Sequence, residues 1–411
     1  STSKVYFLQE VEGGRFEVYF GDGVTGKAIE DGNIVILDYI NGNRDAPNGA
    51  TTFSLSGTIG GFSSATITTV SNASGGTGLE SITSIKYNAP RDYSAQDRAV
   101  TTEDYKTLVK SLYANAQAVQ VYGGEDAATP DYGKVYISIK AKSGSNLTTA
   151  TKESLVQSLK SYAVASVTPV IIDPETTFIT LVVNFRYNSG ITTKDVSTLQ
   201  TNVLTKIASY NNDTLEDFAG MFRYSKLIEA VNDADTSILS NITTVKMYKY
   251  FTPTLNSGLK YTLSYNNALY NPHSGHNSSG GGVISSSGFK VNNDSSLNEH
   301  FLDDDGAGNL RLYYLSGTAR VYTDATYGTV DYATGEVVLT SAHITSISNI
   351  DGASSTQVRV FATPSSNDIV PVRNQVLSID TSNSTITGEV DGIESGSSQA
   401  GTTYTTTSSY S

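Results

Sequence analysis

The chain has 411 residues, a length that fits about two or three domains. Only 16% of the residues are charged, and Ser, Thr, Asn and Gly take their place, which is typical of a β-rich protein with a polar surface. The net charge of −13 argues against partners that need a basic face, namely nucleic acid and an anionic membrane surface. The lack of cysteine excludes disulfides and thiolate sites, and no segment reaches the ~18 apolar residues of a membrane span.

Residues 1–85 are predicted to form a β-rich N-terminal region. Apolar side chains alternate with polar ones in two short runs, and Gly13 and Gly14 between the runs indicate a hairpin. The next segment, Gly21–Lys27, nearly matches the G-x-x-x-x-G-K-[ST] phosphate loop. Ala28 stands where that loop needs a hydroxyl, and a β-branched run follows instead of a helix. We therefore interpret this segment as a tight turn.

Residues 86–252 are predicted to form an α+β domain, and its best-marked helix begins after Thr101. The Thr101 hydroxyl can accept a hydrogen bond from a first-turn N–H, and Asp104 stands three residues later as a variant capping box. Behind this cap, one apolar stripe of helical spacing consists of Tyr105, Leu108, Val109 and Leu112. Two strands with alternating polarity follow, around Val119 and Ile137.

The same pattern recurs further along the chain. Helices are predicted to open near residues 148 and 192, with strands at 170–172 and 179–187. A shorter helix and a further strand complete the domain, at 225–231 and 242–251. Repeated helix–strand–strand units predict an α+β fold, with the helices on one face of a mainly antiparallel sheet.

Three segments of different character follow this domain. Residues 253–288 are rich in Asn, Gly and Ser and are predicted to be a linker or loop. From 289 to 385 strand-like alternation replaces helical periodicity, which predicts a C-terminal all-β domain. Residues 386–411 are rich in Ser, Thr and Gly, and are predicted to be flexible or ordered only by a partner.

Two groups of side chains resemble metal sites. His273 and His276 have a metal-like spacing, but they lie in a Gly/Ser loop without further ligands, and zinc needs three or four. Asp303–Gly306 resembles the opening of a calcium loop. Tyr314 stands where that loop needs a bidentate Glu, so a hairpin turn is the better interpretation.

Asp173 and Glu175 could form an acid–base pair, but carboxylates at a strand end are usually solvated turn residues. No G-x-S-x-G nucleophile elbow occurs. The 26 tyrosines could stack on sugars, as in an adhesin, although tyrosine equally suits protein interfaces. The sequence therefore predicts no catalytic, cofactor-binding or metal-binding residues, no cofactor and no enzymatic activity.

Two stretches carry a resemblance to a known family. Residues 16–43, FEVYFGDGVTGKAIEDGNIVILDYINGN, are similar to the GDG-containing segment of baseplate J-like tail proteins. Residues 89–109, APRDYSAQDRAVTTEDYKTLV, followed by AVQVYGGED and YGKVYISI, resemble the RAVT-x-x-DY helix of the same family. The chain as a whole resembles the C-terminal portion of the baseplate wedge proteins of T4-like contractile-tailed bacteriophages. The start at Ser1 fits a fragment that lacks the family's N-terminal part.

The resemblance implies a structural subunit of the virion, located in the tail baseplate after assembly in the host cytoplasm. Such proteins form homodimers that join into a ring around the tail hub, where they contact other baseplate wedge proteins and the hub or tube region. The ring takes part in the conformational switch that triggers sheath contraction and genome ejection. The resemblance offers no catalytic residues to carry over, and the net charge leaves no nucleic-acid or membrane partner expected. A receptor- or carbohydrate-binding phage tail protein is the alternative, and a tail-associated hydrolase is a third.

Overall fold

The computed structural model describes most of the chain. The described residues are 4–11, 15–38, 42–44, 46–62, 66–67, 73, 76, 78, 80–96, 98–127, 129–142, 146–275 and 282–394. The chain divides into two compact units, residues 1–46 and 47–411, and each is described by itself.

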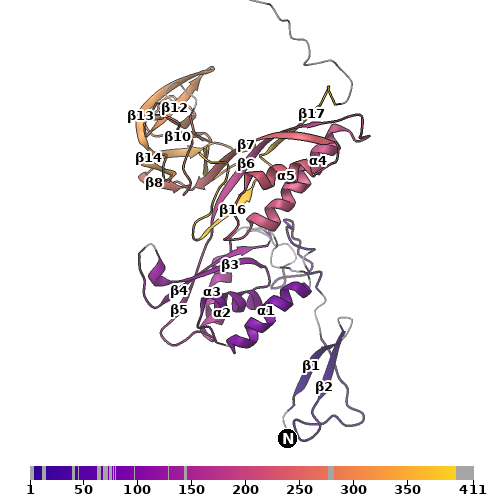
Figure 1. The fold of residues 1–411 in the computed structure, drawn as a ribbon. Coiled ribbons are helices and arrows are strands. Elements are labelled where there is room, and N and C mark those ends of the chain that lie inside the picture. The colour runs from indigo at the N-terminus through magenta and orange to yellow at the C-terminus, as the bar shows by residue number, and fades with distance from the viewer. Residues whose placement is uncertain are drawn as a thin grey trace, which may run out of the picture. The chain divides into compact units, whose positions relative to one another are not determined.

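The first unit contains a two-stranded hairpin (Figure 1). Its strands are β1, Tyr6–Val11, and β2, Arg15–Phe20, which pair in antiparallel fashion along their whole length. The hairpin predicted from Gly13 and Gly14 is thus confirmed, although these two residues lie outside the described part of the chain.

The second unit begins with helices packed on a three-stranded sheet. The helices are α1, Ile82–Ala95; α2, Thr102–Leu112; and α3, Thr149–Lys160. The strands are β3, Ala116–Gly123; β4, Lys134–Ala141; and β5, Thr168–Ile172. Strand β4 pairs with β3 in antiparallel and with β5 in parallel fashion. The helical stripe predicted after Thr101 joins a core with the inward side chains of this sheet, because Tyr105, Leu108 and Val109 are buried beside Ile137.

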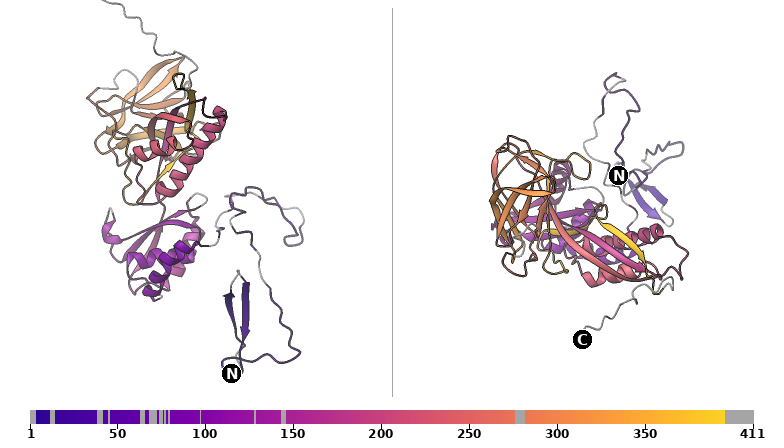
Figure 2. Two further views of the ribbon diagram at one scale, coloured as in Figure 1. Left: turned by 45° about the vertical axis from the view of Figure 1, so that its right-hand side comes forward. Right: turned by 90° about the horizontal axis from the view of Figure 1, so that it is seen from above.

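A larger mixed sheet follows, covered by two helices. Its long central strands are β6, Glu175–Tyr187, and β7, Ile238–Phe251, and its helices are α4, Val196–Tyr210, and α5, Tyr224–Asn232. The shorter strands are β9, Ile284–Ser286; β15, Val358–Ala362; β16, Gln375–Ile379; and β17, Thr385–Val390. Strand β6 alternates buried and less buried side chains, and both helices pack beside the sheet that it forms with β7 and β17 (Figures 1 and 2). The order is β16-β6-β7-β15-β9, and β17 also pairs with β6.

The remaining strands form an all-β body. They are β8, Gly258–Ser264; β10, Phe289–Val291; β11, His300–Asp304; β12, Asn309–Ser316; β13, Ala319–Asp331; and β14, Glu336–Ile347. All pairings among them are antiparallel, and β10 pairs with both β11 and β14. Strands β10 to β14 therefore close into a small five-stranded barrel, and β8 extends the sheet beyond β14.

The predicted fold class, α+β with a C-terminal all-β region, is confirmed. The structure departs from the predicted organisation at three places. Helix α1 was not predicted. Strands β8 and β9 occupy parts of the predicted 253–288 linker. Strands β16 and β17, predicted to belong to the C-terminal domain and tail, instead run parallel to β6. Such pairing partners lie about 200 residues apart in the sequence, and local periodicity carries no information about them. The domain boundaries themselves stay a prediction.

None of the described helices is long and apolar enough to cross a membrane. The last part of the predicted tail, 395–411, lies outside the described residues.

Candidate functional site

The start of α2 is fixed by the capping box that the sequence predicts. The Thr101 hydroxyl accepts a hydrogen bond from the Asp104 N–H at 3.2 Å, and Asp104 Oδ2 accepts one from the Thr101 N–H at 2.8 Å. A further bond at 3.1 Å comes from the Val100 N–H. Burial acts to raise the pKa of Asp104, but these N–H donors outweigh it and lower the pKa. Asp104 is therefore ionised and held in place as a cap.

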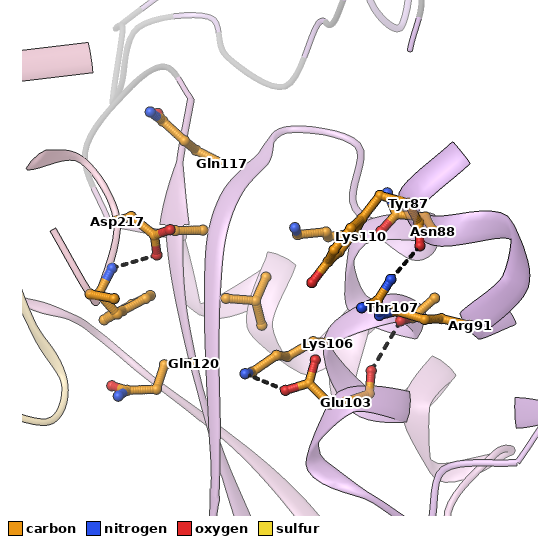
Figure 3. Close-up of a pocket in the computed structure, with 14 residues that line it drawn as sticks. Tyr87, Asn88, Arg91, Glu103, Lys106, Thr107, Lys110, Gln117, Gln120 and Asp217 are labelled. Atoms are coloured by element: carbon orange, nitrogen blue, oxygen red, sulfur yellow. Dashed lines mark hydrogen bonds and ion pairs between the residues drawn. The ribbon is translucent and has the colours of Figure 1, made fainter. Parts of the chain in front are cut away.

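Helix α2 forms one wall of a pocket of about 340 Å³ (Figure 3). The other walls come from α1, β3 and the turn at 217–219. Its charged side chains are Arg91, Glu103, Lys106, Lys110 and Asp217. Positive and negative groups are mixed here, so the pocket has no strong preference for an anion or a cation.

Two of the three cations in this pocket are engaged by their own helix. Lys106 lies 2.7 Å from Glu103, a salt bridge across one turn of α2. The Arg91 guanidinium stacks 3.6 Å from the ring centroid of Tyr87 and donates to the Tyr87 carbonyl at 2.6 Å. Among the described residues that line this pocket, no nucleophile is paired with a base.

The same region contacts the larger sheet through the loop before β16. Asn374 donates from its N–H to Gln120 Oε1 at 2.6 Å and from its side chain to the Asp173 carbonyl at 3.3 Å. Arg373 donates to the Asp126 carbonyl. A small apolar cluster lies beside these bonds and consists of Ala118, Phe218 and Val376. We call these contacts the junction, and no local sequence pattern predicts them.

The segment Gly21–Lys27 forms a turn, as expected. Asp22 Oδ1 accepts hydrogen bonds from the N–H groups of Val24 and Thr25, at 2.8 and 2.7 Å. These bonds lower the pKa of Asp22. No described residue of the first unit is helical, so the helix N-terminus that a phosphate loop needs does not follow this turn.

The remaining candidate side chains do not converge. Asp173 bonds to Lys152 at 2.6 Å and Glu175 to Lys249 at 3.1 Å, so each carboxylate has its own lysine. His273 is exposed, and its Nδ1 lies 3.4 Å from the Ser274 carbonyl oxygen. His276 lies outside the described residues. Within the described part of the chain, no group of three or more His, Asp or Glu side chains could hold a metal ion.

The Asp303–Gly306 segment ends β11 and enters the turn of the β11–β12 hairpin. Asp305 accepts from the backbone N–H groups of Ala307 and Asn309, at 2.8 and 2.9 Å. Asp304 accepts from the Tyr332 hydroxyl at 2.6 Å. The three carboxylates thus serve different partners and do not surround a common point. The hairpin interpretation is confirmed.

Asp303 belongs to a buried polar cluster that the sequence reading missed. It binds Arg311 at 2.9 Å and Arg320 at 2.6 Å, and it accepts from the Tyr322 hydroxyl at 2.9 Å. Arg311 also stacks 4.4 Å from the ring centroid of Tyr322. The signal that could have indicated this cluster was an Asp and an Arg placed to face each other on consecutive strands.

Two parts of the chain match known domain families. Residues 101–172 match baseplate structural protein gp6, C-terminal domain I. Residues 175–250 match baseplate structural protein gp6, C-terminal domain III. The first match covers α2 to β5 and the second covers β6, α4, α5 and most of β7.

The chain is also 30% identical over 287 residues to the baseplate wedge protein gp6 of Enterobacteria phage T4. The matched part covers 64% of this chain and 43% of that protein, so the chain spans less than half the length of its relative. A chain in the structure of the anti-feeding prophage baseplate is 14% identical, with a TM-score of 0.29, over 42% of this chain and 39% of its own. The resemblance to baseplate wedge proteins read from the sequence is confirmed by the two domain matches and the T4 relative.

Proposed function

We propose that this chain, which carries C-terminal domains I and III of the gp6 baseplate structural proteins, works as a structural subunit of a phage tail baseplate wedge. The observation that carries the proposal is the succession of the two domain matches along one chain, together with 30% identity to a baseplate wedge protein. Its place is then the tail of the virion, after assembly in the host cytoplasm.

The finer part of the proposal is the assembly. Copies of the chain form homodimers that join into a ring around the tail hub and contact other wedge proteins and the hub or tube region. A closed ring forms only when the rotation that relates neighbouring subunits brings the last subunit back into contact with the first. The pocket between α1, α2 and β3 supports this role, because Tyr87 and Arg91 are of the residue types enriched in protein interfaces.

We further propose that the ring takes part in the switch that leads to sheath contraction and genome ejection. A switch of this kind needs bodies that stay rigid while the contact between them changes. The junction supports this idea, because two separate cores meet there through a three-residue apolar cluster and a few hydrogen bonds. The chain has a mechanical role here and catalyses nothing.

Sedimentation equilibrium of the purified chain over a wide concentration range tests the assembly. A dimer or larger species is the expected result. A strict monomer at all concentrations would contradict self-association of this chain.

The switch is tested by cross-linking assembled baseplates before and after contraction. We expect cross-links across at least one interface of this chain to differ between the two states. An unchanged set across every interface would rule out a part in the switch while leaving the structural role intact.

A further inference from the structure

Helix α4 is followed directly by one π-helical turn, Asn211–Leu215, which we call the π-turn. Its closing hydrogen bond runs from the Glu216 N–H to the Asn211 carbonyl at 3.2 Å, one residue further along the chain than an α-helical bond reaches. Single π-helical turns are rare in proteins and occur frequently at functional sites. Contacts outside the helix must therefore stabilise this turn against the α-helical register.

The Asn211 side chain supplies two such contacts. It is 6% exposed, and its Oδ1 accepts a hydrogen bond from the Ile379 N–H of β16 at 2.6 Å. Its Nδ2 donates to Glu216 Oε1 at 3.0 Å. In the α-helical register the Asn211 carbonyl would instead accept from the Leu215 N–H, and Glu216 would move about 100° around the helix axis. Both bonds between Asn211 and Glu216 therefore depend on the π register.

The chain after the π-turn folds back on it so closely that only glycine fits at position 220. A Cβ atom on Gly220 would lie 2.7 Å from the Leu215 carbonyl oxygen and closer still to the Thr214 carbonyl oxygen. The Gly220 N–H donates to the Asp217 carbonyl at 3.0 Å. This tight turn fixes the position of Phe218 relative to the π-turn.

The position of Phe218 matters because this residue belongs to the junction. Phe218 forms the apolar cluster of the junction together with Ala118 of β3 and Val376 of β16. Asn211 bonds both to β16 and to the residue after the π-turn, so it fixes the Phe218 turn and β16 to each other. Residues 217–219 also line the α1–α2–β3 pocket (Figure 3), the surface that we propose for neighbouring proteins.

We propose that the π-turn is the latch of the junction. In the π register, the bonds between Asn211 and Glu216 place Phe218 against β3. A slip to the α-helical register breaks these bonds, withdraws Phe218 from the cluster and frees the two cores to move relative to each other. The slip shifts the chain by one residue and requires neither core to unfold. This inference rests on the proposed part in the switch, for which it names the moving element.

Deletion of Asp213 is the decisive variant. Asp213 is an exposed residue of the π-turn, and without it the segment has the length of an α-helical turn. Asp213→Ala is the matched control, because it changes the same side chain and keeps the length of the turn. The melting temperature of each variant shows whether the chain is folded.

Spin labels at Lys160→Cys on α3 and Ser316→Cys on β12 measure the distance between the two bodies in the full chain, which contains no other cysteine. We expect one narrow distance distribution in the parent and in Asp213→Ala. The deletion variant should give a displaced or clearly broader distribution, because Phe218 no longer holds β3. Identical distributions in the parent and in the folded deletion variant would overturn the proposal.

Two substitutions at Glu216 test the latch without changing the length of the chain, in case the deletion variant does not fold. Glu216→Ala removes the acceptor of the Asn211 amide, whereas Glu216→Gln keeps an oxygen that can accept the same bond. We expect a broader distance distribution in Glu216→Ala and the parent distribution in Glu216→Gln. Equal distributions in these two variants would also overturn the proposal.

These measurements separate the latch from the proposed function. They use the chain outside the baseplate, so a negative result contradicts the latch and leaves the structural role and the ring intact. Cross-links that stay unchanged in assembled baseplates contradict the part in the switch, whatever the labels report.

Discussion

At the scale of single residues, buried charge dominates the C-terminal barrel. Asp303 is 1% exposed and neutralises two arginines, while the Tyr322 hydroxyl completes its hydrogen bonds. Burying charge is costly, and the arrangement is stable only when every member is paired. The acidic side chains of this segment therefore contribute to the folding of the barrel.

Substitution of Asp303 should be strongly destabilising. Asp303→Asn leaves the buried Arg311 without its counter-charge and removes the partner of the more exposed Arg320, and the expected loss is about 3 kcal/mol in the free energy of unfolding. Chemical denaturation measures it. Glu229→Gln is the matched control, because its pair with Lys226 is solvent-exposed and should contribute little to stability. Similar losses in the two variants would show that Asp303 is not a buried partner.

Asp235 should make stability depend on pH. Hydrogen bonds from Lys194 and from Ser237 lower the pKa of Asp235 to about 2. A carboxyl whose pKa is depressed by folding stabilises the protein above its unfolded pKa, and the effect is lost as pH falls through the folded pKa. We expect about 2 kcal/mol to disappear between roughly pH 4 and pH 2. Denaturation of the parent chain and of Asp235→Asn at several pH values checks this. The stability difference between them should be large at pH 6 and small near pH 2, and a difference that does not vary with pH would contradict the assignment.

At the scale of elements, helix caps and apolar periodicity predicted those helices whose ends and buried faces depend on residues close together in the sequence. The cap at Thr101 occurs as the sequence indicates, and a helix opens near residue 148 as predicted. The helix predicted to open near residue 192 begins at Val196, after the cap residue Asp195. Helix α1 escaped prediction because it contains Pro90, a residue that argues against a helix interior, and because its apolar residues Ile82 and Ile85 are exposed and form no buried stripe. The sequence also did not predict the parallel pairing of β16 and β17 with β6, because these strands lie far from β6 along the chain.

The capping box of α2 gives an element-scale prediction. Thr101→Ala removes the side-chain acceptor for the Asp104 N–H and should cost about 1 kcal/mol. Amide hydrogen exchange should speed up most in the first turn of α2. Thr102→Ala is the control, because Thr102 is an exposed first helical residue outside the cap. Equal exchange rates in the two variants would mean that the cap does not hold the helix start.

At the scale of the whole molecule, the candidate site was only partly visible in the sequence. The RAVTTEDY segment marks α2, one wall of the α1–α2–β3 pocket. The turn at 217–219 and the loop around Asn374 also belong to this region, although both lie far from α2 in the sequence. No periodicity or motif predicts these contacts. The proposed structural role therefore rests on the resemblance to baseplate wedge proteins and not on a reactive group.

The junction yields the last prediction. Phe218 lies 8% exposed in the three-residue cluster, so Phe218→Ala should loosen the contact between the two cores without removing a side chain from either of them. Because the chain has no cysteine, spin labels can be attached at Lys160→Cys and Ser316→Cys without competing thiols. We expect the distance distribution between the labels to broaden in Phe218→Ala, and to stay narrow in Met221→Ala, whose side chain is 38% exposed. An equally narrow distribution in Phe218→Ala would show that the hydrogen bonds of Arg373 and Asn374 hold the junction on their own.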